Sequence, residues 1–519
     1  MKNIKKMKKT FIMATAAITL MMTMTILTSC TDSDDILLTS PEQEQEQENL
    51  ADYTIIFYGH GGGNLDMDIL ANVMQLYQGK AESYDRVNIV AQYKFSSEEN
   101  MLVKFSAADA QYFGSQSIRF VVERDADKTY NNFDDCYTDD MLYGEKNADF
   151  TCPDSLTRFI NWAAKRCPAK HYLLILSDHG GGYVPYEELP KEDLTDTRGI
   201  IYDDGNNYKN FTVKSLHRAL SNADVHMQTI YMDACLMNTI EYQYELKDVA
   251  DYLVLSTFLV PGYGGHYDFL IDQLAAHHDD TEKALSEYNR QAVSYWDDEY
   301  SQYTNYFNYH DMSVIRTAAL EAFGQKWKLF TDKLIAAYQS GDETVKQKIN
   351  QATAIVPRVN NDTPLFDIGD YYLSIYKLAP EVIDDAFYAE LDAAYKNTVV
   401  SKHNSDFLEN YGMIIDCSIL ICKQGHYNVC DIIELSNGDK MFSYLYTYYA
   451  DGSLYELDTQ TQEMKPSGTW GGTLENTYQQ LAFDRATGWS RWLMINEQEP
   501  PYASYADFHI DLPSVLNLK

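Results

Sequence analysis

The chain has 519 residues, of which 45% are hydrophobic and 23% are charged. This balance is that of a globular protein and excludes global disorder, a collagen-like repeat and a coiled coil. The 77 Asp and Glu residues against 41 Lys and Arg residues give a formal charge of −36. A field of this sign repels phosphate backbones and argues against nucleic acid as a partner. At roughly 150 residues per domain, the length allows about two to four domains.

The first 50 residues have the pattern of an export signal followed by a tether. Five lysines lie within residues 1–9, and residues 11–27 carry no charge, a pattern typical of a signal peptide and short for a membrane-spanning helix. The segment ends in Leu27-Thr28-Ser29-Cys30, which resembles the lipobox of bacterial lipoproteins, where the cysteine becomes lipidated. We therefore expect a signal peptide over 1–29, a flexible acidic tether over 30–50, and a lipid anchor at Cys30 as the only link to a membrane. These features place the protein at the bacterial outer membrane or cell surface.

Runs of apolar and β-branched residues alternate with helical patterns between residues 51 and 275. Strands are predicted over 53–58, 87–93, 118–122, 172–176, 229–232 and 252–257, and helices over 65–77, 155–166, 213–221 and 238–249. This alternation predicts an α/β domain with a mostly parallel sheet covered by helices on both faces. Residues 276–400 have helical periodicity, clearest over 320–338, and residues 401–519 form a β-rich C-terminal region.

Two reactive side chains directly follow predicted strands. His179 comes after the strand 172–176, and Cys235 comes after the strand 229–232. Because functional groups collect at the carboxyl ends of parallel strands, we expect both at one edge of the sheet. A thiolate is a strong nucleophile, and an imidazole lowers its pKa and later protonates the leaving amine. The N–H groups of Gly180 and Cys235 would bind the oxyanion, and the dipole of the helix after Cys235 would favour its thiolate.

Two motifs resemble those of the clostripain family of cysteine peptidases. The segment YLLILSDHGGG (172–182) is similar to the histidine motif of that family, and DACLMNTIE (233–241) is similar to its nucleophile motif. Similar stretches continue to the segment 481–489, so the resemblance covers most of residues 51–495. It implies a caspase-like α/β/α sandwich and a dyad of His179 as general base and acid with Cys235 as nucleophile. It also implies cleavage of proteins or peptides after Arg or Lys.

The resemblance extends to specificity and self-processing. A basic P1 side chain requires an acidic group in its pocket, and Asp233 of the nucleophile motif is one candidate. Some relatives place an acidic residue where this chain has Tyr263, and the nearby Asp268 is the expected substitute. Relatives also undergo self-cleavage at a basic residue between the catalytic strands. Lys191 and Arg198, in the predicted loop 184–198, are the corresponding candidates.

No cofactor is expected, and we assign no metal. The acidic pair Asp203 and Asp204 could hold calcium, which occurs in the family, or could form a solvated turn. Cysteines 417, 422 and 430 are close enough for one disulfide, with no indication of which two would pair.

Two other functions were weighed against the peptidase. The segment GHGGG (59–63) resembles the oxyanion loop of lipases, but the chain lacks the G-x-S-x-G elbow that such an enzyme needs. The main alternative is a catalytically silent, peptidase-like surface lipoprotein that binds proteins or peptides. In that alternative, the tryptophans of the C-terminal region would serve recognition, namely Trp470, Trp489 and Trp492.

Overall fold

The computed structural model describes residues 50–496, which belong to one compact unit beginning at Leu50. The exceptions within this range are residues 63, 96–115, 126, 132, 137–141, 147, 184–198, 204–208, 301–308, 358, 360–364, 413, 422–426, 435–439, 449–452, 459–462 and 470–477. The signal segment, Cys30 and the predicted loop 184–198 therefore lie outside the described residues. Within the described ranges, no helix has both the length and the apolar character needed to cross a membrane.

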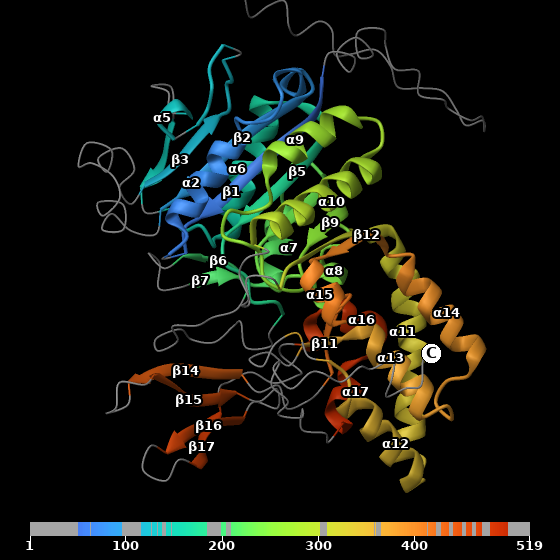
Figure 1. Cartoon of the computed structure of the whole chain (residues 1–519). Helices are drawn as coiled ribbons and strands as arrows, with labels where there is room; N and C mark the ends of the chain where they lie inside the picture. The colour runs from blue at the N-terminus through green and yellow to red at the C-terminus, as the bar shows by residue number, and fades with distance from the viewer. Residues whose placement is uncertain are drawn as a thin grey trace, which may run out of the picture. The chain divides into compact units, whose positions relative to one another are not determined.

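A nine-stranded sheet forms the centre of the unit, in the order β12-β10-β9-β8-β5-β1-β2-β3-β4 (Figure 1). The five middle strands are parallel: β9 (Ala250–Leu255), β8 (Met227–Asp233), β5 (Ala169–Ser177), β1 (Ala51–His60) and β2 (Val87–Lys94). The flanking strands are antiparallel: β3 (Gln116–Val121), β4 (Leu142–Lys146), β10 (Asp311–Arg316) and β12 (Val399–Asn404). The predicted α/β class is confirmed. The strand 252–257 is not the last, because β10 and β12 from beyond residue 276 extend the sheet.

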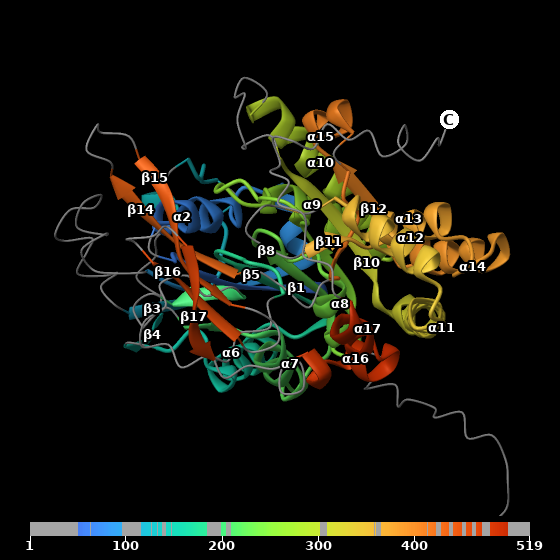
Figure 2. The same cartoon turned by 90° about the horizontal axis from the view of Figure 1, so that it is seen from below.

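The strands supply two separate hydrophobic cores. Along β1, Ile56 and Tyr58 enter one core, Ile55 and Phe57 enter the other, and all four are fully buried. A strand buried on both faces has a continuous apolar sequence rather than an alternating one. The first core is covered by α6 (Pro153–Arg166), α7 (Val213–Ser221) and α8 (Ile240–Glu245), and the second by α2 (Asp66–Gln75), α9 (Tyr267–Ala276) and α10 (Thr281–Tyr300) (Figure 2).

Local sequence signals place most helix ends correctly. The helices α7 and α11 (Leu320–Tyr338) have the predicted bounds. Thr212 caps α7, since its Oγ1 accepts a hydrogen bond from the Ser215 N–H at 3.1 Å. In contrast, α8 is shorter than the predicted helix 238–249, because residues 234–239 form a turn that carries Cys235.

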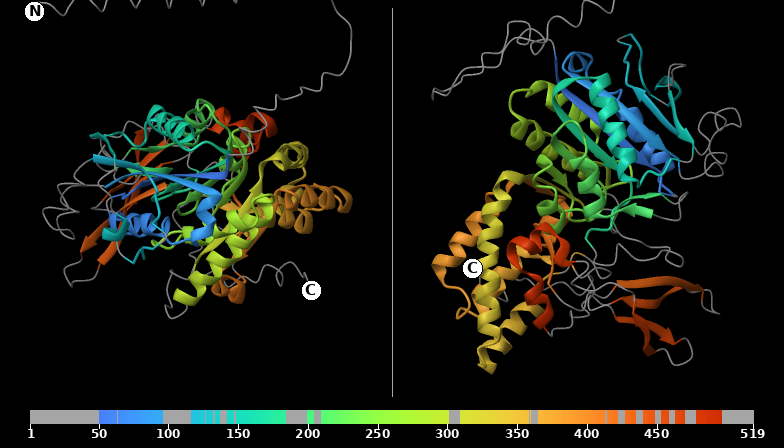
Figure 3. Two further views of the ribbon diagram at one scale, coloured as in Figure 1. Left: turned by 90° about the horizontal axis from the view of Figure 1, so that it is seen from above. Right: turned by 180° about the vertical axis from the view of Figure 1, so that it is seen from behind.

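The remaining elements complete the unit (Figure 3). The predicted helical region contains α11, α12 (Glu343–Ala354), α13 (Ile368–Leu378) and α14 (Asp385–Lys396). Beyond residue 401 lie α15 (Asp406–Tyr411), α16 (Ala482–Thr487), α17 (Ser490–Ile495) and an antiparallel sheet of β14 (Tyr427–Glu434), β15 (Lys440–Tyr448), β16 (Ser453–Asp458) and β17 (Glu463–Thr469). Two-stranded sheets pair β11 (Leu365–Asp367) with β13 (Ser418–Leu420) and β6 (Ile200–Asp203) with β7 (Lys209–Phe211), and α5 (Phe133–Cys136) is a single turn.

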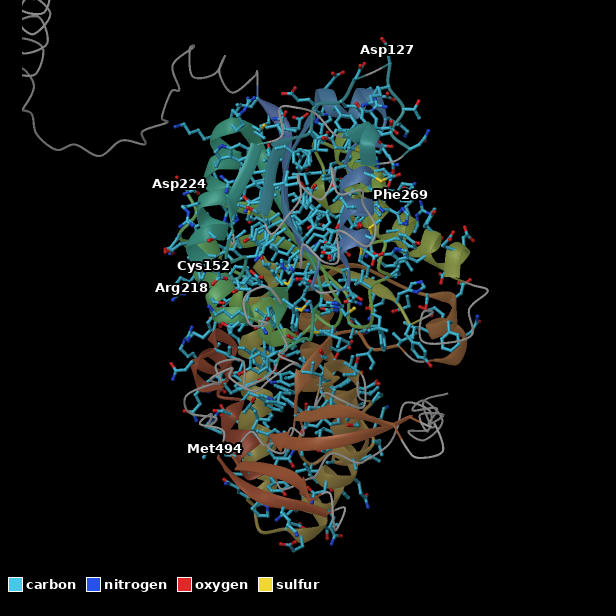
Figure 4. The ribbon with its side chains drawn as sticks, turned by 90° about the vertical axis from the view of Figure 1, so that its left-hand side faces the viewer. Asp127, Cys152, Arg218, Asp224, Phe269 and Met494 are labelled. Atoms are coloured by element: carbon cyan, nitrogen blue, oxygen red, sulfur yellow. The ribbon has the colours of Figure 1, made fainter. Side chains whose placement is uncertain are left out.

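The C-terminal tryptophans are part of the core rather than of a recognition surface. Trp489 and Trp492 are fully buried in the first core, and the Trp489 Nε1–H donates to the Leu420 carbonyl at 2.7 Å. Met494 of α17, labelled in Figure 4, is 51% exposed. Trp470 lies outside the described residues. These two tryptophans therefore attach helix α17 to the first core and are not available to bind a partner.

Candidate active site

Strands β5 and β8 bring the two predicted catalytic residues to one edge of the sheet. The strands are adjacent and parallel, and Ser177 pairs with Asp233. Both strands end at this register position, so His179 and Cys235 each lie two residues beyond it. The prediction of a shared edge is confirmed.

The loops that carry His179 and Cys235 are in backbone contact. A Cβ atom added at Gly180 would lie 2.4 Å from the Cys235 carbonyl oxygen and 2.9 Å from the Ala234 Cβ. Only glycine allows this approach. His179 and Cys235 both line a cleft of about 320 Å³, whose other walls come from α2 and from residues 259–264.

The Cys235 thiol is held in a neutral form by its surroundings. Burial raises the pKa of this thiol to about 11; the backbone contact with Val260 lowers it, and the charge of Asp233 raises it. The Val260 N–H points at Sγ from 3.3 Å. The helix α8 begins only at Ile240, so the expected stabilisation of a thiolate by a helix dipole is not found.

A loop residue and a residue of strand β6 hold the His179 ring. Its Nε2 lies 2.6 Å from Oδ1 of Asn64, and the edge of Tyr202 meets the ring with centroids 6.2 Å apart. An amide oxygen only accepts hydrogen bonds, so this contact places the ring proton on Nε2 and leaves Nδ1 to accept another. The sequence analysis found no residue to orient His179. Asn64 follows β1, which pairs in parallel with β5. Residues after β1 therefore lie at the same edge of the sheet as His179, and this rule could have identified Asn64.

Asp233 lies at the buried end of the cleft. Its Oδ2 accepts hydrogen bonds from the Gly265 N–H at 3.1 Å and from the Tyr267 hydroxyl, and its Oδ1 accepts one from the Tyr231 hydroxyl at 3.3 Å. Burial raises the pKa of Asp233 to about 6, and these donors oppose that rise. The carboxylate is therefore largely ionised at neutral pH.

Helix α2 adds two acceptors that the sequence analysis missed. Asn72 is 2% exposed and donates to Ser177 Oγ at 3.0 Å, whereas its Oδ1 has no hydrogen-bond partner among the described residues. A Cβ atom at Gly264 would lie 2.5 Å from this Oδ1 and 2.6 Å from Asp233 Oδ2, so the two oxygens face one point. Asp68, one turn earlier on the same helix face, also lines the cleft.

The other predicted acidic residue lies elsewhere. Asp268 occupies the first turn of α9, and its Oδ1 is 3.9 Å from His266 Nδ1. The described lining of the cleft includes Asp68 and Asp233 but not Asp268. Tyr263 is 55% exposed. The second acid in the described lining of the cleft, beside Asp233, is thus Asp68.

The described residues offer no metal site or disulfide. They contain no cluster of three or more His, Cys, Asp or Glu side chains able to hold a metal ion, and Asp203 is engaged by Lys94. Asp204, Lys191 and Arg198 lie outside the described residues. Within the described part of the chain, the free cysteines are Cys136, Cys152 (labelled in Figure 4), Cys167, Cys235 and Cys417. Cys422 and the side chain of Cys430 are not described, so the predicted pairing stays a prediction.

The fold and the cleft together define a caspase-like α/β protein with cysteine and histidine at the carboxyl edge of its sheet. A sequence profile of the clostripain family matches residues 127–465, and the chain belongs to this family. Clostripain of Hathewaya histolytica is 26% identical over 288 residues, which cover 50% of this chain and 51% of that protein. The chain thus matches about half the length of this curated relative.

Solved structures share the fold. Two X-ray structures of a secreted C11 cysteine protease from Bacteroides thetaiotaomicron are 17% identical to this chain, with TM-scores of 0.52 and 0.50. They cover 85% and 84% of this chain, and the match spans 99% of each of them. The first contains an irreversible peptide inhibitor. At this identity the likeness shows the architecture alone.

We expect Gly180→Ala to destabilise the protein by about 1–3 kcal/mol, because the new Cβ overlaps backbone atoms that cannot rotate away. Urea denaturation would measure this change. Gly369→Ala is the control, since Gly369 lies within helix α13 and the nearest atom to its new Cβ would be Asp367 Oδ1, at 3.2 Å. Equal stability of Gly180→Ala and wild type would show that the two loops do not touch.

We expect iodoacetamide to label Cys235 slowly at pH 7, with a rate that rises steadily beyond pH 9. Only the thiolate reacts, and a pKa of about 11 leaves roughly one thiol in a thousand ionised at pH 8. Mass spectrometry of the Cys235 peptide would give the rate, with the fully buried Cys417 as an internal reference. A rate plateau below pH 7 would instead indicate a resting thiolate–imidazolium pair.

Proposed function

We propose that the protein is a cysteine endopeptidase that hydrolyses peptide bonds through Cys235 and His179. The observation that carries the proposal is the placement of a thiol and an imidazole in one cleft, on loops held in backbone contact at Gly180. Membership of the clostripain family supports the same activity. The chain retains both residues of the dyad, which argues against a catalytically silent relative.

The proposed mechanism begins with a neutral thiol. As Sγ of Cys235 attacks the substrate carbonyl carbon, its proton passes to His179, and the carbonyl oxygen becomes an oxyanion that the N–H groups of Gly180 and Cys235 stabilise. His179 then gives the proton to the leaving amine as the C–N bond breaks. Water, deprotonated by His179, hydrolyses the thioester and restores the thiol. The contact with Asn64 keeps the imidazole in one tautomer through both steps.

The cleft favours a basic P1 side chain. Its buried end presents the carboxylate of Asp233 and the unpaired Oδ1 of Asn72, and its wall presents the carboxylate of Asp68. These groups accept hydrogen bonds, and Lys and Arg side chains only donate them. We therefore propose cleavage after Arg or Lys.

Two further parts of the proposal concern residues outside the described ranges. Export with a lipid anchor at Cys30 is supported by the signal-like segment before it, and the solved relative is a secreted protease. Self-cleavage at Lys191 or Arg198 is supported by their position in sequence between the two catalytic strands.

The first experiment is digestion of a peptide library varied at P1, using residues 31–519 as wild type and as Cys235→Ala. We expect cleavage after Arg or Lys by the wild type and none by the variant, since Cys235 provides the attacking sulfur in the proposed mechanism. His179→Ala should lower kcat by at least about a hundredfold. Absence of cleavage, even after nicking at Lys191 or Arg198 and with calcium added, would favour the binding-protein alternative.

Specificity is tested by replacing the acceptors one at a time. We expect Asn72→Leu, which keeps the shape of the side chain, to raise KM for Lys and Arg substrates by about tenfold or more, with a smaller change in kcat. Asp68→Asn should have a weaker effect, because this carboxylate is only half-buried. A substrate with Gln at P1 is the control. Equal losses for basic and neutral substrates would mean that Asn72 supports the fold rather than selecting the cation.

A further inference from the structure

A chain of buried charged groups lies behind His179. Lys94 Nζ is 2.7 Å and 2.8 Å from the two carboxylate oxygens of Asp203. His60 Nε2 is 3.4 Å from Asp203 Oδ1, and His60 Nδ1 is 3.4 Å from Asp178 Oδ2. None of the four side chains is more than 4% exposed. These residues come from the ends of β2, β6, β1 and β5, and the last one directly precedes His179.

The stability of the fold does not explain this arrangement. Burial raises the pKa of Asp203, but His60 and Lys94 bring it down to about 2. Burial lowers the pKa of His60, but Asp178 and Asp203 bring it up to about 9. Buried charges are costly to remove from water, and apolar residues of similar size often stabilise a fold equally well. Buried ionic groups of this kind are therefore better explained by the geometry that they fix.

Asp178, at one end of this row of buried charged groups, fixes the backbone of His179 and one side of its ring. Asp178 Oδ1 accepts a hydrogen bond from the His179 N–H at 2.6 Å, and Asp178 Oδ2 accepts one from the Tyr202 N–H at 2.6 Å. The Tyr202 ring in turn meets the His179 ring edge-on. Because His60 contacts the same Oδ2, a displacement of His60 or of β6 would reach His179 through Asp178.

His60 also fixes the loop that orients the other side of the imidazole. The Gly62 N–H points at His60 Nδ1 from 2.8 Å, and a Cβ at Gly62 would lie 2.8 Å from Cδ2 of His179. Two residues later, Asn64 contacts His179 Nε2. A charged His60 donates from Nδ1 to Asp178, and a neutral one accepts there from Gly62. This nitrogen thus lies between the two loops around His179 and bonds to one of them in each state, to Asp178 when charged and to Gly62 when neutral.

The backbone of β6 is strained where it meets this network. Ile201 has φ of 60°, although a β-branched residue strongly disfavours the left-handed region. Such strain persists only where the surroundings hold the chain in place, and it concentrates at functional sites. Here the holding contacts are those of Asp203 with Lys94 and of Tyr202 with Asp178. The strained residue directly precedes Tyr202 and Asp203, whose contacts both lead to His179.

We propose that Lys94, Asp203 and His60 are positioning residues that set the orientation of His179 toward Cys235. The inference rests on the proposed role of His179 as general base and acid. None of these three residues lines the described cleft, whereas Asp178 and Asn64 do, so they act through Asp178 and through the loop carrying Asn64. The GHGGG segment thus supports the proposed catalytic histidine through His60 and Gly62.

The test compares Asp203→Asn and His60→Gln with a matched control at the other end of the sheet. Asp52, at the start of β1, is a carboxylate with 8% side-chain exposure that pairs with the half-exposed Arg86 and Lys170, and Asp52→Asn removes the same charge far from the cleft. On one basic-P1 peptide, we expect Asp203→Asn and His60→Gln to lower kcat by about ten- to a hundredfold, with KM within about threefold of wild type. Asp52→Asn should keep both constants, whatever thermal stability it loses.

Several outcomes would overturn the inference. Loss of kcat in proportion to the fall in melting temperature, with Asp52→Asn behaving alike, would assign the network to stability alone. Unchanged kcat in both network variants would do the same. If Asp203→Asn fails to fold, His60→Gln decides the matter, because it leaves the pair of Lys94 and Asp203 intact. Failure of the proposed function is distinguishable, since the wild type would then cleave nothing and His179→Ala would have no effect.

Discussion

The parallel pairing of β5 with β8 is the constraint on which the site depends. The register of Ser177 with Asp233 sets both strands to end together, and this places His179 and Cys235 at matching positions beyond them. A shift of one residue would turn every side chain of one strand to the opposite face. Two separate cores oppose such a shift, because Leu174 and Leu176 fill one and Leu173 and Ile175 fill the other. Packing of the strands far from the cleft thus fixes its geometry.

The site also requires that its loops approach one another closely. Glycine residues, which have no side chain, allow this approach. Gly180 lies against the Cys235 carbonyl, Gly62 lies against Asp178 and His179, and Gly264 leaves open the space between Asn72 and Asp233. A methyl group at any of these positions would occupy space that the cleft or its supports need. The polar contacts around His60 and His179 therefore depend on the glycines beside these residues. Polar groups make those contacts, and the glycines let the contacting loops come within reach.

Local sequence patterns predicted the central strands, the helices α7 and α11, and the shared edge of His179 and Cys235. They did so because these features depend on short-range periodicity and on one general rule for parallel sheets. They missed β10 and β12 as members of the sheet, since each pairs with a strand distant in sequence. They also missed Asn64, Asp68 and Asn72. These residues line the cleft only because one face of α2 and the loop before it pack near the ends of β5 and β8. The dipole expected at Cys235 failed because a turn of residues 234–239 replaces the first turn of helix.

The cleft contains a conflict that binding of a substrate would resolve. Asp233 lies two residues from Cys235, and its negative charge raises the pKa of the thiol that must lose its proton. The same carboxylate is the strongest feature of the proposed P1 pocket. A Lys or Arg side chain bound there would offset the charge of Asp233. The electrostatic effect by which Asp233 adds to burial in raising the pKa of the thiol would then be lost. On the proposed specificity, the group that selects the substrate therefore also restrains the nucleophile in its absence. Binding energy from the P1 cation would act on the reacting sulfur as well as on recognition.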